Sequence, residues 1–289
     1  MTFSGISEKG REMSRQPLSD SQLAALIAWD EESHTEHFDA MNRLFESFSS
    51  PEEITALARS WWADPDERVR ALGFDLLAVQ AVDFSWHVPP LIEAANALPL
   101  DTTHEDVRWS AAHALATICD DDRVLFPLLR FAADPDSDVR WHVARGIPVG
   151  VDPLPEDAVR VLLGLMRDPD DHVRDWATMA LGGCEENDTQ EIRDAFFVRL
   201  EDQGADTAGE AAVALAKRHD ARLLPVLKRR LADPDVGNLY VEAAAALGDP
   251  QLLPLLRKLK ADGWQDDEPR PQLLDEALEA CAPRTPPIT

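Results

Sequence analysis

The chain has 289 residues, 45% of them hydrophobic, and carries 28 lysines and arginines against 54 aspartates and glutamates, a formal net charge of −26. The hydrophobic content is that of a folded protein and exceeds that of disordered chains. The negative charge argues against binding to nucleic-acid phosphates or anionic lipid, which requires clustered cations. Binding to another protein, for example a basic one, remains compatible with this charge.

In chain order, residues 1–17 are predicted to be a flexible N-terminus, and residues 18–50 to form capping helices outside any repeat. Residues 51–282 are predicted to form a solenoid of about seven antiparallel helix pairs, and residues 283–289, which contain three prolines, a flexible C-terminus. The expected first and second helices of the pairs are 51–62/65–82, 86–98/103–118, 121–133/135–148, 155–167/169–182, 188–201/203–218, 220–232/234–247 and 249–261/270–281.

A recurring motif carries this prediction. Asp-Pro-Asp begins at residues 64, 134, 168 and 233, and variant copies begin at Thr102 and Asp202, so that the spacings are 38, 32, 34, 34 and 31 residues. A period in the thirties indicates stacked helical hairpins, and no alternating strand pattern competes with it. The leading Asp or Thr is expected to be the helix N-cap, with proline at the first helical position.

The repeats resemble a known family. The stretch 168–182 reads Asp-Pro-Asp-Asp-His-Val-Arg-Asp-Trp-Ala-Thr-Met-Ala-Leu-Gly, which is similar to the HEAT repeat, in particular the short bacterial HEAT-like repeats of the phycobilin-lyase type. The resemblance implies an all-α, right-handed α-solenoid, a HEAT-like superhelix whose second helices line the concave face. It covers residues 51–281 and is specific for fold rather than for function.

The same resemblance implies a structural ladder of Asp–Arg pairs between neighbouring repeats. The Val-Arg pair that follows the motif provides the arginines, and the motif itself provides the aspartates. The expected members are Arg70, Arg108, Arg140, Arg174, Asp64, Asp134 and Asp168. The ladder is expected to stop in the last two copies, where Ala208 and Tyr240 take the arginine position.

A partner-binding strip is expected on the concave face. A residue two positions after the core valine lies about 200° around the helix and points away from the core. In the middle repeats this position and the one a turn later hold Trp109, His113, Trp141, Arg145, Asp175 and Met179. Trp and Arg are favoured in protein-binding hot spots, and Trp141 with Arg145 can form a cation–π pair. The alternative is that these side chains pack against the next repeat, which is the interpretation we favour for Trp176.

No cofactor or metal is expected. One HEAT-like family is a di-iron hydroxylase with His-Glu dipeptides after the Val-Arg pair, and the corresponding positions here hold none. His34 and His37 stand at a spacing that can chelate zinc, but a third ligand is not evident, and a solvated or capping pair is the favoured interpretation. No Gly-x-Ser-x-Gly motif or phosphate-binding loop occurs.

The cellular context follows from simple features. Cys119, Cys184 and Cys281 are far apart and odd in number, which is typical of reduced thiols. The first residues contain no signal-peptide h-region, and no run approaches about 18 apolar residues. A cytoplasmic monomer with no membrane contact is therefore expected.

The sequence thus favours a non-enzymatic protein–protein interaction scaffold that binds a partner on its concave face. One alternative is an immunity-type inhibitor of a basic, nuclease-like toxin. Another is an enzyme, a HEAT-like DNA glycosylase or a bilin-lyase-type protein. In the glycosylase, Trp109 and Trp141 would stack on a base while Asp175 stabilised a cationic sugar, but the negative charge disfavours nucleic acid.

Overall fold

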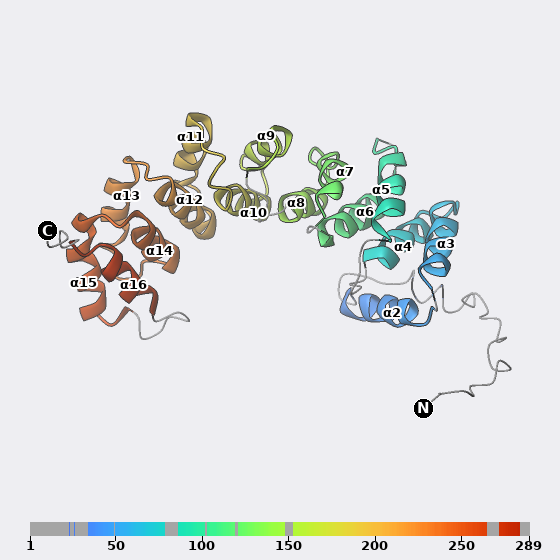
Figure 1. The fold of residues 1–289 in the computed structure, drawn as a ribbon, viewed down its shortest axis with the longest axis horizontal. Coiled ribbons are helices and arrows are strands. Elements are labelled where there is room, and N and C mark those ends of the chain that lie inside the picture. The colour runs from blue at the N-terminus through green and yellow to red at the C-terminus, as the bar shows by residue number, and fades with distance from the viewer. Residues whose placement is uncertain are drawn as a thin grey trace, which may run out of the picture.

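The computed structural model describes residues 23, 26, 34–48, 50–78, 86–101, 103–118, 121–147, 153–264 and 272–283 (Figure 1). Within these residues the regular elements are helices, and no strand is present. No helix among them is long and apolar enough to cross a bilayer. The predicted flexible segment 1–17, and all of the predicted flexible segment 283–289 except Pro283, lie outside the described residues.

The predicted all-α solenoid is confirmed, and its described part contains seven helix pairs. The first helices are α3 (Pro51–Trp62), α5 (Val88–Ala97), η3 (Asp122–Val124) with α7 (Leu125–Leu129), α9 (Glu156–Leu165), α11 (Gln190–Arg199), α13 (Leu223–Arg230), and η4 (Pro250–Leu252) with α15 (Leu253–Ala261). The second helices are α4 (Glu67–Ala78), α6 (Glu105–Thr117), α8 (Ser137–Gly146), α10 (Asp171–Gly182), α12 (Ala205–Lys217), α14 (Asn238–Leu247) and α16 (Gln272–Ala280). A further helix, α2 (His34–Glu46), precedes the pairs.

Figure 1 shows two layers that bend into an arch. The second helices, from α4 to α16, follow one another along the inner side of the arch, and α5, α7, α9 and α11 lie outside them. The second helices can pack closely because their facing surfaces carry small residues. A Cβ on Gly146 would lie 2.6 Å from the Cβ of Ala116, so the α6–α8 contact requires glycine at that position. The second helices α6 and α8 therefore approach each other more closely than larger side chains would allow.

The helices begin later than the motif predicts. The N-cap of α8 is Asp136 rather than Asp134, and the N-cap of α10 is Asp170 rather than Asp168. The leading aspartate instead closes a turn, since Asp134 Oδ1 accepts a hydrogen bond from the backbone N–H of Asp136 at 3.0 Å. The predicted N-cap was wrong because the carboxylate of Asp134 accepts hydrogen bonds from the turn and from Arg108 of the preceding repeat. The second aspartate of the motif, Asp136, therefore caps the helix.

Ion pairs link consecutive repeats through these leading aspartates. The arginine after the core valine donates from Nε and Nη2 to both carboxylate oxygens of the next repeat, a bidentate geometry that is strong for a charged pair. The pairs are Arg108–Asp134 (2.7 and 3.1 Å), Arg140–Asp168 (2.7 and 2.8 Å) and Arg174–Asp202 (3.0 and 3.0 Å). The aspartate side chains are only 2–6% exposed. We call these three pairs the inter-repeat rungs.

Two predicted ladder members differ, and one rung residue was missed. Arg70 pairs with Glu67 on its own helix, and Asp64 Oδ1 accepts from the backbone of Asp66; neither forms a rung with a described residue. The reason is positional: the residue that matches Asp134 in the second repeat is Thr102, which has no carboxylate for Arg70. Asp202 completes the last rung, although the sequence analysis did not assign it.

Helix α2 covers the inner side of the first pair. His37 lies 3.2 Å from Asp75 of α4, and both residues are buried. The expectation of a solvated or capping histidine pair was therefore wrong for His37, because α2 packs onto α4 and withdraws this side chain from water. Figure 1 shows α2 on the concave side of α4, so the free concave surface begins beyond the first repeat.

Candidate functional site

Three tryptophans from three consecutive second helices surround one pocket on the concave side. They are Trp109 of α6, Trp141 of α8 and Trp176 of α10, and each is half-buried, so that part of each indole faces solvent. The pocket has a volume of about 620 Å³, within the range of ligand-binding pockets. The rest of its lining is His113, Asp138, His142, Arg145, Asp170 and His172. We call it the concave pocket.

The rings of the concave pocket hold one another in place. Trp109 stacks on His113 with centroids 5.0 Å apart, and the buried His142 meets Trp109 and Trp141 edge-on at 4.9 Å. Trp141 also meets Trp176 edge-on at 5.9 Å. Such edge-to-face contacts favour a fixed arrangement, since the positive ring edge meets the negative face of its neighbour. The aromatic surface is therefore preorganised.

One cation already lies on this surface. The guanidinium carbon of Arg145 lies 5.5 Å from the centroid of the Trp141 ring, one helical turn away, as the sequence predicts. Asp138 and Asp170 add two carboxylates to the lining. Indole faces and carboxylates both attract cations, so the chemistry of the pocket suits a cationic or aromatic side chain.

Acidic residues extend the concave face beyond α10. Burial, together with the negative charges of Asp175 and Glu242, raises the pKa of Glu210 on α12 to about 7, although Lys217 opposes the rise. Burial also raises the pKa of Asp175, with Asp206 as the next contributor. Carboxylates on α10, α12 and α14 therefore share a region of negative potential.

Part of the chain matches a known protein family. The family model for HEAT repeats matches residues 127–194 and 159–247. Residues 127–247 are HEAT repeats. Protein YibA of Escherichia coli K12 is 32% identical over 166 residues, which are 56% of this chain and 58% of YibA. The alignment thus spans little more than half of that relative.

One solved structure shares the fold over most of the chain. The X-ray structure of Escherichia coli YibA has a TM-score of 0.70 at 24% identity and covers 91% of this chain and 92% of YibA. At that identity the likeness shows a shared fold alone. The structure of human deoxyhypusine hydroxylase has a TM-score of 0.33 at 20% identity, which is too low to carry an argument about chemistry.

The expected partner-binding strip divides into two parts. Trp109, His113, Trp141 and Arg145 line the concave pocket, whereas Asp175 and Met179, although half-buried on α10, do not. Trp176 was expected to pack beside the core and instead lines the pocket, because the edge of Trp141 supports it from the preceding helix. A glycosylase site would need Asp175 beside the tryptophans, but Asp175 does not line the concave pocket.

Two of the three cysteines are buried. Cys184 and Cys281 are both fully buried, and burial raises the pKa of the Cys281 thiol to about 11. Such thiols are poor nucleophiles at neutral pH because the thiolate is disfavoured. Cys119 lies outside the described residues. In the part of the chain that the structure describes, no group of three His, Cys, Asp or Glu residues is placed to hold a metal ion.

Proposed function

We propose that the protein is an interaction scaffold that binds another protein in the concave pocket. The observation that carries this proposal is the meeting of three half-exposed indoles, from α6, α8 and α10, around one pocket. Exposed tryptophan is costly in water, and clusters of Trp with Arg are typical of interaction hot spots. The ring contacts limit the entropy that binding would cost.

The partner that fits best is a basic protein. Carboxylates lie beside the pocket on α10, α12 and α14. The pKa of Glu210 is raised to about 7 first by burial and then by the negative charges of Asp175, Glu242 and Asp206. A cationic segment that lies along α10, α12 and α14 gains from these negative charges and can place a lysine or arginine against the indoles. An inhibitor of a basic toxin is one form that such a scaffold can take.

A pull-down from native lysate tests the proposal with three forms of the full chain. The wild type is compared with Trp141→Ala, which removes the central indole, and with Phe126→Ala, which removes a 57% exposed phenylalanine on outer helix α7. We expect a basic protein that the wild type and the Phe126 variant retain, that the Trp141 variant loses, and that high salt releases. Recovery of the same proteins by all three forms would show the proposed site to be wrong.

A further inference from the structure

One helix of the chain itself lies on the concave side. Helix α2 covers the inner side of α4, where His37 lies 3.2 Å from Asp75 (Figure 1). Met41 of α2 is fully buried, and Leu44 and Phe45 pack against the same core. These residues, at positions i, i+4, i+7 and i+8, form one face of an amphipathic helix. The opposite face of α2 is polar and exposed, with Asp39, Asn42, Arg43 and Glu46. The first repeat therefore binds an amphipathic helix on its concave side.

The surface that α2 covers in the first repeat is partly open to solvent in the next three. Ala71 and Asp75 lie two and six positions after the core valine of α4, and both are buried. In α6, α8 and α10 the residues at these positions are half-buried or exposed. They are the expected partner-binding strip, Trp109, His113, Trp141, Arg145, Asp175 and Met179. The repeat structure therefore indicates what kind of element can lie on this strip.

A single helix is long enough to cover the open surface. Packed helices lie about 8–10 Å apart, so α6, α8 and α10 together extend over about 16–20 Å. At a rise of about 1.5 Å per residue, a helix with the 13 residues of α2 is about 20 Å long. A partner helix of that length can therefore contact all three tryptophans of the concave pocket.

We propose that the partner of the concave pocket presents a basic amphipathic helix, which lies across α6, α8 and α10 on the side where α2 lies on α4. Its apolar face covers the indoles, as apolar helix faces do in helix-binding grooves. Lysines or arginines at the edge of that face reach Asp138 and Asp170 in the pocket lining. In the first repeat, His37 of α2 faces the carboxylate of Asp75 in a similar way. This inference rests on the proposed function, since it names the element that the concave pocket recognises.

Three labelled peptides of equal length and charge test the inference, by fluorescence anisotropy with the full chain. The first keeps the histidine, methionine, leucine and phenylalanine of the buried α2 face in their order and spacing, with lysine and alanine at its other positions. The second has the same composition in an order that spreads the apolar residues around the helix. The third has two prolines in place of central alanines, so that it cannot form a continuous helix.

We expect the first peptide to bind with a dissociation constant of about 100 μM or below, and the other two to bind at least about fivefold more weakly. Trp141→Ala should weaken binding of the first peptide by a similar factor, because it removes the central indole. Phe126→Ala, at an exposed position on outer helix α7, should leave that binding unchanged.

Each of four results overturns the inference: no binding of the first peptide, equal binding of the first and second peptides, equal binding of the first and third peptides, or binding that Trp141→Ala does not weaken. Equal binding of the first and third would mean that an extended segment suffices. The peptide comparison uses the wild type alone, so it decides even if Trp141→Ala fails to fold. The pull-down tests the proposed function separately, because it retains a basic partner whatever that partner's secondary structure.

Discussion

Two acidic residues illustrate how neighbours decide what burial does to a charge. Burial alone would raise the pKa of Asp168, but hydrogen bonds from Arg140 and from the backbone of Asp170 outweigh it and lower that pKa. Glu210 has no such partners, and burial with nearby carboxylates raises its pKa to about 7. The first carboxylate therefore stabilises the fold at neutral pH, and the second opposes it.

Glu210→Gln should stabilise the protein above pH 7. Because the pKa of Glu210 is raised from 4.5 to about 7 in the native state, the native state binds a proton that the unfolded chain releases, and the free energy of unfolding falls as the pH rises through that window. At pH 8 we expect the variant to be more stable than the wild type by the order of 1–2 kcal/mol, with no gain of this origin at pH 4. Urea unfolding at the two pH values measures this, with the exposed Glu191→Gln as a control that should change little. A pH-independent gain would contradict the assignment.

Arg140→Gln should cost about 2–4 kcal/mol of the free energy of unfolding, because it leaves the Asp168 carboxylate, 6% exposed, without its partner. Arg70→Gln should cost less than about 1 kcal/mol, since Glu67 is much more exposed and can be hydrated. Chemical denaturation of the two variants side by side gives the comparison. Equal losses would mean that the rungs contribute no more than a surface ion pair.

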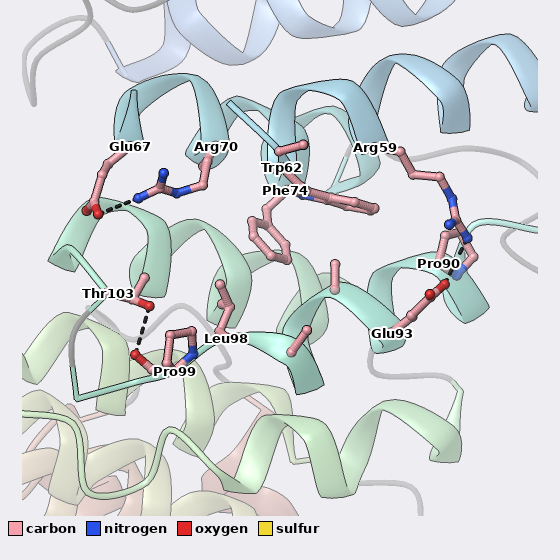
Figure 2. A pocket seen from close by; sticks show the side chains of 13 residues that line it. Arg59, Trp62, Glu67, Arg70, Phe74, Pro90, Glu93, Leu98, Pro99 and Thr103 are labelled. Carbon is pink, nitrogen blue, oxygen red and sulfur yellow. Dashed lines mark hydrogen bonds and ion pairs between the residues drawn. The ribbon is translucent and has the colours of Figure 1, made fainter. Parts of the chain in front are cut away.

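At the scale of elements, close helix packing requires glycine at particular positions as well as large apolar side chains. The indole of Trp62, at the end of α3, lies directly on Gly73 of α4, where a Cβ would come within 2.6 Å of the Trp62 Cδ1 and Nε1 atoms. This contact fixes the α3–α4 hairpin and also shapes one wall of a pocket that lies between α3, α4 and α5 (Figure 2).

Gly73→Ala should therefore destabilise the protein by about 1–3 kcal/mol, because the added methyl group must displace a packed indole. Gly164→Ala is the matched control: it is also a helical glycine, on α9, but a Cβ there meets nothing within 4 Å. That variant should be neutral or more stable by up to about 1 kcal/mol, since alanine favours helix. Thermal melts of both variants, with tryptophan fluorescence to follow Trp62, test the pair. If the two substitutions had the same effect, the proposed contact would be of no consequence.

On the scale of the whole molecule, the protein is a stack in which each pair packs mainly on its neighbours. The rungs tie the second to the fifth pairs together and end at Asp202, after which Ala208 takes the arginine position. In such an array, stability is approximately a sum over repeats and their interfaces. The central pairs, which have two neighbours and the rungs, should be the most stable.

Hydrogen exchange followed by mass spectrometry should find the slowest amides in α8, α10 and α12. Exchange should be faster in α15 and α16, which pack on one neighbouring pair among the described residues. Arg174→Gln should speed exchange in α10 and α12, on both sides of the broken rung, more than in α4 or α16. Uniform protection along the chain, or a uniform response to the substitution, would indicate a single cooperative unit instead.

Much of the site could be predicted from the repeat. The position two residues after the core valine placed Trp109 and Trp141 on the concave side, and the i,i+4 spacing gave the Trp141–Arg145 contact. Trp176 was missed because its position in the helix places it near the core when α10 is considered alone. A ring from the preceding second helix, Trp141 of α8, decides where it lies. Asp75 shows the opposite case, since its position matches the strip but α2 covers it.

The sequence by itself determined the helical repeat, because the 3.6-residue period, the motif and its spacing are local properties that recur in every copy. It also determined which residues face away from the core within each helix. The tertiary structure alone decided which of them meet, since the bend of the stack brings indoles from three helices around one pocket and α2 closes the first repeat. It decided as well how the first junction is closed: Glu67 pairs with Arg70 and accepts a hydrogen bond from the backbone N–H of His104 in the next repeat, a contact that no local pattern predicts.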